Sequence, residues 1–230
     1  MQESIFIACT IVLVYIFILL NRKSLKLVEY NGHKFMIQSK NTTENSVQLL
    51  GEIVQRLFIL RNYLVENRNK IYNCCDCEKC LEDNSTCSTN ECNNCNECLS
   101  YLKNYLSLED FYESVDLLKN NFNQNRTKFY ENINDTKYTS YSVNKGEEMV
   151  FCLKARNINR NYHPIDLLMY VAIHELAHCG CKEIGHTRLY NKIFKVYLII
   201  GIKLNLYNYV NYENSPVEYC GMKLSSNILN

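Results

Sequence analysis

The chain has 230 residues, of which 47% are hydrophobic and 21% are charged, so it can bury one sizeable core. Its 25 basic and 24 acidic side chains give a formal net charge of +1. Because no strong overall charge attracts it to phosphate groups, nucleic-acid binding is not indicated. We expect one globular domain, residues 24–230, with residues 1–23 attached to it as a membrane anchor.

An almost wholly apolar segment runs from Ile5 to Leu20. Its length is at the short end of the roughly 17–25 residues that a membrane-spanning helix needs. Glu3 precedes the segment and Asn21-Arg22-Lys23 follows it, which is typical of an uncleaved anchor rather than a cleaved signal peptide. The basic residues predict a single-pass protein, anchored through residues 4–20, whose body faces the cytoplasm. A buried core helix is the alternative.

Two short strands are predicted next, Leu25–Tyr30 and Lys34–Gln38. Between them lies Asn31-Gly32, a dipeptide typical of tight hairpin turns. Apolar residues then recur at helical spacing from Glu44 to Val65. We expect this amphipathic helix to pack on the body of the domain.

Residues 73–100 form a segment of different composition, rich in cysteine and almost free of large apolar side chains. Such a segment cannot build a core of its own, so cross-links or metal must hold it. Pairs of cysteines with two residues between them suit a structural zinc site, for which the candidate ligands are Cys77, Cys80, Cys92 and Cys95. Disulfides are the rival interpretation, favoured outside the cytosol. A disordered insertion without metal is a third.

Helical spacing returns between Tyr101 and Asn120, and this helix can pair with the one before the cysteines. Two further strands, Tyr138–Val143 and Glu148–Leu153, are predicted on either side of a turn at residues 144–146. In zinc peptidases an extended substrate can pair with an edge strand beside the metal helix. We expect Met149–Leu153 to be this edge strand.

The most informative motif is His174-Glu175-Leu176-Ala177-His178, on a helix expected to start at Pro164 and Asp166. Residues four apart lie on one face of a helix, so both imidazoles can bind one metal ion. This H-E-x-x-H arrangement is typical of zinc peptidases. His186 offers a third ligand and leaves the fourth position of a tetrahedral zinc ion for water. Glu183 is the alternative third ligand, and a buried helix with two hydrogen-bonded histidines is the alternative to a metal site.

A last helix is expected from Thr187 to about Leu204. Lys195 and Lys203 leave too short an apolar run between them for a second membrane span, so we expect a core helix behind the metal helix. The tail from Tyr212 to Leu229 contains proline and glycine among polar residues. It is predicted to be a loop with short extended pieces.

The segment from Leu168 to His178, followed by Glu183-Ile184-Gly185-His186 and an aromatic-containing helix, resembles the metal motif of WLM and SprT-like metallopeptidases. From residue 25 onwards, the resemblance implies an α+β zincin-like fold, with a metal-binding active-site helix and a small antiparallel sheet. The site residues that it implies are His174, His178 and His186 as Zn²⁺ ligands and Glu175 as general base. Some family members degrade proteins crosslinked to DNA, but only the peptidase chemistry is carried over to this chain.

The chemistry of such a site also follows from the residues. Zinc held by three neutral imidazoles lowers the pKa of its bound water and polarises the scissile carbonyl. Glu175 takes the proton from that water and returns it to the leaving amine. An oxyanion-stabilising group is also needed, and the candidates are Tyr212, Tyr219 and His163. Met222 is either a methionine turn beneath the metal or an ordinary core residue.

The sequence thus predicts a membrane-anchored, cytosol-facing zinc metallopeptidase that hydrolyses protein or peptide substrates. The alternative from another class is a catalytically silent, membrane-tethered adaptor that binds a partner through its cysteines. The intact Glu175 argues against the adaptor, because a scaffold has no use for the base. A secreted or lumenal disulfide-rich protein is a third option, which free-thiol counting would separate. Cys179 and Cys181 are either redox-sensitive residues or simply buried ones.

Overall fold

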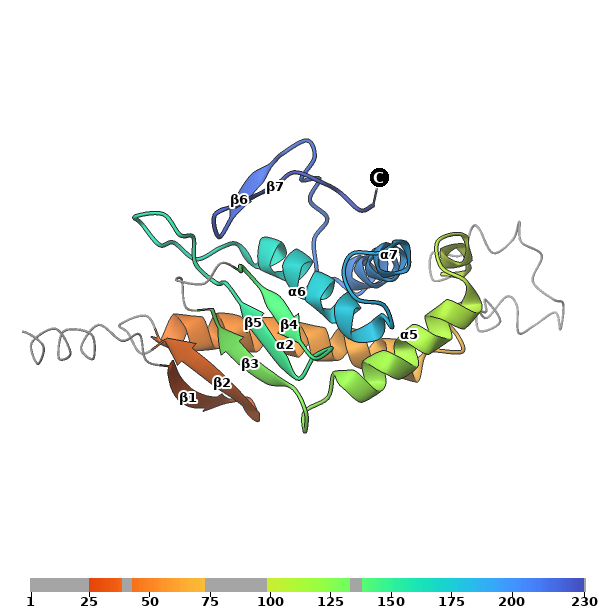
Figure 1. The fold of residues 1–230 in the computed structure, drawn as a ribbon, viewed down its shortest axis with the longest axis horizontal. Helices are drawn as coiled ribbons and strands as arrows, with labels where there is room; N and C mark the ends of the chain where they lie inside the picture. Colours follow the sequence, from red (N-terminus) through yellow and green to blue (C-terminus); the bar gives the residue numbers. More distant parts are fainter. Residues whose placement is uncertain (1–24, 39–42, 73–98, 133–137, 230) are drawn as a thin grey trace, which may run out of the picture.

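The computed structural model describes residues 25–38, 43–72, 99–132 and 138–229 (Figure 1). Within these ranges, a five-stranded sheet is combined with four α-helices, a short 3-10 helix and a separate two-stranded hairpin. The predicted α+β class is confirmed. The sheet, however, is mixed rather than antiparallel.

The strands of the sheet follow the order β1-β2-β3-β5-β4. β1 (Leu25–Tyr30) and β2 (His33–Gln38) form the predicted antiparallel hairpin, in which Asn31 and Gly32 have φ values of 50° and 75°. β3 (Lys128–Glu131) was not predicted, and it pairs in parallel with both β2 and β5. β2 and β3 can pair in parallel because the chain between them passes through helices. β3 and β5 are parallel because β4, which is antiparallel to β5, lies between them in the chain.

The second predicted hairpin consists of β4 (Tyr141–Val143) and β5 (Glu148–Phe151). Residues 144–146 in its turn all have positive φ. In the described sheet β5 lies between β3 and β4, so β4 is the edge strand on this side of the sheet. The prediction of Met149–Leu153 as the edge strand is therefore wrong: those side chains are buried and the backbone of β5 is paired on both sides.

The described residues form four α-helices. They are α2 (Thr43–Glu66), α5 (Leu108–Asn121), α6 (Ile165–Gly180) and α7 (Arg188–Lys203). α6 carries the motif and contacts α2, α5, α7 and β4, so it is central to the fold (Figure 1). At Gly201 of α7 a side chain would lie 2.9 Å from Ile173 Cδ1, which shows how closely α7 approaches α6.

The helix predicted between Tyr101 and Asn120 is divided. A 3-10 helix, η1 (Ser100–Asn104), precedes α5, which begins after Ser107. The Ser107 hydroxyl accepts a hydrogen bond from the backbone N–H of Asp110 at 3.2 Å. A serine in this position caps a helix start, and this local preference outweighed the continuous apolar spacing.

No helix in the part of the chain that the structure describes is long and apolar enough to span a membrane. α6 and α7 have 16 residues each, fewer than a span requires, and the 24-residue α2 carries charged side chains such as Glu52 and Arg56. The predicted single-pass membrane localisation is corrected accordingly. Residues 4–20, on which that prediction depended, lie outside the described residues, as do four predicted zinc ligands: Cys77, Cys80, Cys92 and Cys95.

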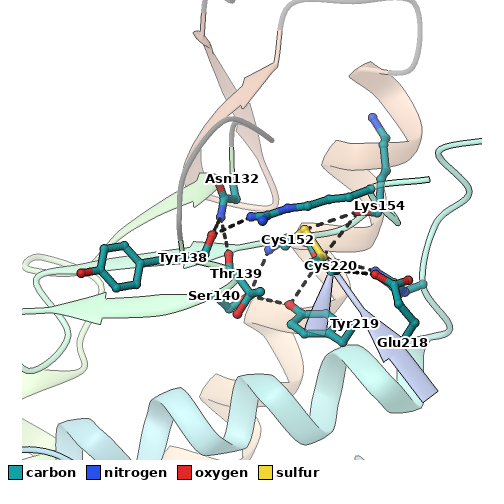
Figure 2. Close-up of a disulfide and its surroundings, with 12 residues drawn as sticks. Asn132, Tyr138, Thr139, Ser140, Cys152, Lys154, Glu218, Tyr219 and Cys220 are labelled. Atoms are coloured by element: carbon teal, nitrogen blue, oxygen red, sulfur yellow. Dashed lines mark hydrogen bonds between the residues drawn. A yellow bond between two sulfur atoms is a disulfide. The ribbon is translucent and has the colours of Figure 1, made fainter. Parts of the chain in front are cut away.

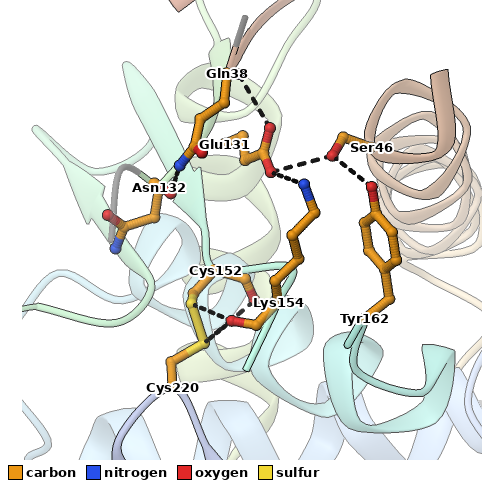
Figure 3. Close-up of polar contacts among 8 residues, drawn as sticks. All are labelled: Gln38, Ser46, Glu131, Asn132, Cys152, Lys154, Tyr162 and Cys220. Atoms are coloured by element: carbon orange, nitrogen blue, oxygen red, sulfur yellow. Dashed lines mark hydrogen bonds and ion pairs between the residues drawn. A yellow bond between two sulfur atoms is a disulfide. The ribbon is translucent and has the colours of Figure 1, made fainter. Parts of the chain in front are cut away.

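A buried polar network joins the end of β3 to α2 and to the segment after β5 (Figure 3). Glu131 is 3% exposed; it accepts hydrogen bonds from the Gln38 N–H and the Ser46 hydroxyl. The Lys154 ammonium lies 3.2 Å from the same carboxylate and 4.8 Å from the centre of the Tyr162 ring. Because the Glu131 carboxyl group is paired with Lys154 and hydrogen-bonded, the cost of burying it is offset and it holds the three segments together.

The tail forms a hairpin of β6 (Val217–Tyr219) and β7 (Met222–Leu224), as the predicted extended pieces suggested. In the described structure this hairpin pairs with no strand of the main sheet. A disulfide, which was not predicted, joins Cys152 after β5 to Cys220 in the hairpin turn (Figure 2). The buried Tyr219 adds a second attachment, since its hydroxyl donates to the Cys152 carbonyl at 3.1 Å and lies 2.5 Å from Ser140 Oγ.

Replacing Cys152 and Cys220 together with Ser is expected to lower the free energy of unfolding by about 2–5 kcal/mol. The cross-link joins positions 68 residues apart and therefore restricts the unfolded chain strongly. Urea unfolding of the variant and the wild type measures the loss. Cys179→Ser with Cys181→Ser is the matched control, because both are buried free thiols. Equal losses in the two variants would show that the cross-link itself contributes nothing.

Candidate metal centre

α6 and the loop after it bring His174, His178 and His186 together. Their candidate ligand nitrogens all lie within 4.8 Å of one another. His186 Nε2 is 3.0 Å from that of His174 and 3.2 Å from that of His178. Tetrahedral zinc with Zn–N bonds near 2.0–2.1 Å would place its ligand nitrogens about 3.3 Å apart. The three imidazoles can therefore hold one metal ion of this size.

The loop that carries His186 is held by the turn between β4 and β5. The Lys145 ammonium donates to the carbonyl of Cys181 at 2.7 Å and to that of Glu183. The side chain of Glu183, the alternative third ligand, is turned to the Thr187 hydroxyl instead and does not belong to the histidine cluster. A left-handed residue, Gly185 with φ of 83°, then leads the chain back to the cluster.

Tyr190 forms a platform beneath the three histidines, and it was not among the predicted site residues. Its buried ring stacks on His178 with a centroid distance of 4.1 Å and contacts His174 and His186 at 5.3 and 5.0 Å. Its hydroxyl donates to the His174 carbonyl at 3.0 Å. The sequence signal was an aromatic residue four positions after His186, in the first turn of the next helix, but such residues are too common in core helices to be selected by spacing alone.

Glu175 is 5% exposed and hydrogen-bonds to the side chain and backbone of Ser142 on β4. Burial raises its pKa from 4.5 to about 7, while the bonds from Ser142 oppose this shift. Burial and neighbouring histidines lower the pKa of His174 to about 3 and that of His178 to about 4. Both imidazoles are therefore neutral at pH 7, the form that binds metal.

A cavity of about 690 Å³ lies over the cluster. Its walls come from the β4 edge, the three histidines with Glu175, the loop at Ile184 and the β6–β7 hairpin. Of the oxyanion candidates, Tyr219 lines the cavity, whereas Tyr212 and His163 are buried and are not among its lining residues.

Met222 is 55% exposed in the cavity wall, so its interpretation as a core residue is wrong. It follows the hairpin turn and pairs with Tyr219, and the hairpin lies outside the main sheet.

Cys179 and Cys181 are free thiols and are buried. Burial raises the pKa of both thiols, which favours their interpretation as inert core residues.

A viral protein matches the chain along almost its whole length. The uncharacterized protein R325 of Acanthamoeba polyphaga mimivirus is 32% identical over 228 residues, which make up 97% of this chain and 95% of that protein. The chain belongs to the R325 family. Uncharacterized protein 136R of Invertebrate iridescent virus 6 matches a part of this chain. The two are 36% identical over 84 residues, which make up 35% of this chain and 44% of that protein. No protein-family model matches.

Among solved structures, Wss1 from Saccharomyces cerevisiae is 20% identical to this R325-family chain. The alignment covers 49% of this chain and 83% of Wss1, with a TM-score of 0.31. A mutant of Wss1 gives a similar result, with a TM-score of 0.30.

The raised pKa of Glu175 predicts a pH-dependent stability. A carboxyl whose pKa rises from 4.5 to about 7 on folding contributes stability that is complete below pH 4.5 and is lost as the pH rises through 7. Glu175→Gln cannot ionise. We compare the unfolding free energy of the variant with that of the wild type at each pH. This difference is expected to be roughly 2–3 kcal/mol more favourable to the variant at pH 8 than at pH 4.5.

Urea unfolding with a chelator present, at both pH values, measures this difference without a metal contribution. The control is Glu29→Gln, which changes an exposed carboxyl on β1. A gap between Glu175→Gln and the wild type that does not change with pH would contradict the prediction.

Proposed function

We propose that the chain is a zinc-dependent metallopeptidase that hydrolyses extended segments of protein or peptide. The observation that carries the proposal is the convergence of His174, His178 and His186 within 4.8 Å in the cavity that Glu175 also lines. Three imidazoles, of which His174 and His178 are neutral at pH 7, and one carboxyl with a pKa near 7 are the donor set and the base that this reaction needs.

The residues of the chain have separate roles in this proposal. A bound zinc ion would supply an acidified water molecule and polarise the scissile carbonyl. Glu175 accepts the proton of the water and delivers it to the leaving amine. Ser142 orients the Glu175 carboxylate through its hydrogen bonds, and Tyr190 fixes the imidazole rings.

β4 is suited to bind the substrate backbone. It is one of the two edge strands of the described five-stranded sheet, and its residues line the cavity beside the histidines. An extended peptide can add to such an edge through backbone hydrogen bonds, which place its carbonyl groups near the metal cluster. β4 thus takes the place of β5 as the strand that binds the substrate.

Tyr219 is assigned to the structure of the cavity wall rather than to the oxyanion. Its hydroxyl already bonds to the Cys152 carbonyl and to Ser140, and both bonds hold the hairpin in place. The silent-adaptor alternative is less well supported. Burial raises the pKa of the Glu175 carboxyl, and a scaffold without catalytic activity has no need of such a group.

The proposal is tested with the full-length protein. We expect it to contain zinc and to cleave an unfolded protein such as reduced casein, to lose the activity with a metal chelator and to regain it when zinc is returned. Zinc bound at the histidines without cleavage of any unfolded protein or peptide would support the adaptor instead. Cleavage that persists in the metal-free protein would contradict a zinc mechanism.

A further inference from the structure

Two exposed apolar side chains line the cavity. Ile184, in the loop before His186, is 88% exposed, and Met222, in the β6–β7 hairpin, is 55% exposed. Other large apolar side chains that are exposed in the described ranges, such as Ile158 and Leu27, lie outside the cavity. Single exposed apolar residues are ordinary on a surface, but two in the wall of one cavity indicate a surface that is covered when a ligand binds.

The two side chains stand at opposite ends of β4. Ser140, which precedes β4, contacts Tyr219 of the hairpin that carries Met222. Lys145, which follows β4, donates to the backbone of the loop that carries Ile184. Glu175 bonds to Ser142 in the middle of the strand, so the histidine cluster lies between the two apolar side chains.

The direction of β4 determines which part of a substrate each residue meets. The strand runs from the hairpin end to the loop end. A peptide that pairs with it in the more stable antiparallel sense runs from the loop to the hairpin. The residue before the scissile bond then lies beside Ile184, and the residue after it lies beside Met222.

The surroundings favour apolar substrate side chains. Tyr170, Val171 and Leu224 line the cavity together with Met222. Among the described lining residues Glu175 is the one carboxylate, whereas Lys145 and Lys223 are cationic. A cationic substrate side chain would therefore find little compensation, while an apolar one would bury its surface against a flexible methionine.

We propose that Met222 and Ile184 determine the specificity of the cavity, and that it takes an extended peptide with an apolar side chain on each side of the scissile bond. Ile184 selects the residue before the bond and Met222 selects the residue after it. This inference rests on the proposed peptidase function and names its substrate class.

The test uses a peptide library that is randomised around a single cleavage position, digested by the full-length protein and read by mass spectrometry. The wild type is expected to favour Leu, Ile, Met or Phe over Ser or Asp by about tenfold or more at both adjacent positions. Met222→Glu should reduce this preference after the scissile bond and raise the cleavage of peptides with Lys or Arg there. Ile184→Glu should do the same before the bond.

Two variants serve as controls. Ile158→Glu makes the same change at an Ile that is fully exposed outside the cavity, and Met222→Leu keeps an apolar side chain; both should retain the wild-type preference. If Met222→Glu and Ile184→Glu also retain it, the inference is overturned while the peptidase function stands. If Met222→Glu changed the preference before the scissile bond and Ile184→Glu changed the preference after it, the antiparallel direction of the peptide would be wrong.

Binding to the Glu175→Gln variant separates this inference from catalysis. Fluorescence anisotropy of labelled peptides is expected to show about tenfold weaker binding of an apolar peptide when Met222→Glu is added. If the wild type holds zinc and cleaves nothing, yet this binding difference is found, the peptidase proposal fails and the apolar selectivity of the cavity remains. Equal binding with and without Met222→Glu would overturn the selectivity.

Discussion

Replacing His174 and His178 together with Ala is expected to remove metal from the α6 site and to abolish peptide cleavage. His186 alone would remain, and one imidazole cannot hold a zinc ion that three held before. Elemental analysis should show a loss of about one zinc per chain, while any zinc held by the cysteine segment is retained. Cleavage should fall to the level of the chelated wild type.

The same variant has a second readout that does not depend on activity. The pKa values of His174 and His178 are lowered to about 3 and 4, so their contribution to stability is complete above pH 6.5 and is lost as the pH falls through 4 to 3. In the presence of a chelator, the double variant should therefore lose less stability than the wild type between pH 7 and 4.

His33→Ala is the matched control, because His33 packs on Phe58 and lies outside the cluster. It should keep its zinc and its cleavage activity. If the double variant retains all of its zinc, then α6 is not a metal site and the peptidase proposal fails.

Glu175→Gln is expected to lower the rate of cleavage by about 10²–10⁴-fold while the zinc content stays unchanged. The carboxyl is not part of the histidine cluster, and its proposed task is to carry a proton, which an amide cannot do. The kcat for a peptide that the wild type cleaves measures the loss. Metal analysis of the same sample shows whether the site is still occupied.

Ser142→Ala is a graded companion to this variant. It keeps the carboxylate but removes its side-chain hydrogen bond, so a smaller loss of about 10–100-fold is expected. If the Glu175→Gln variant kept the activity of the wild type, a group other than Glu175 would carry the proton. A variant that has lost its zinc would show that Glu175 supports the metal site rather than the proton transfer.

Sequence reasoning was most successful where the information is local. The turn at Asn31-Gly32, the start of the last helix at Thr187 and the apolar spacing of α2, α6 and α7 depend on residues within a few positions of one another. The i, i+4 placement of His174 and His178 is likewise a property of the helix itself. These features could be read without knowledge of the rest of the chain.

The features that sequence reasoning missed depend on contacts between segments that are distant in the chain. β3 acquires its place by pairing with strands far from it in the chain, and β4 rather than β5 is at the edge because β3 occupies the other side of β5. The Cys152–Cys220 disulfide depends on the path of the tail. Spacing along a chain carries no information about such partners, because many arrangements satisfy the same local pattern.

By itself, the sequence determined the metal-motif helix and the identity of the histidine pair with its carboxyl, since these follow from helical periodicity and side-chain chemistry. The α+β class was implied by the resemblance of that motif to a known family. Only the tertiary structure decided that His186 rather than Glu183 completes the cluster and that Tyr190 supports it. It also placed Met222 in the cavity wall. The reason is that a loop conformation and a buried contact are set by the packing of the whole domain, which no single segment of the chain contains.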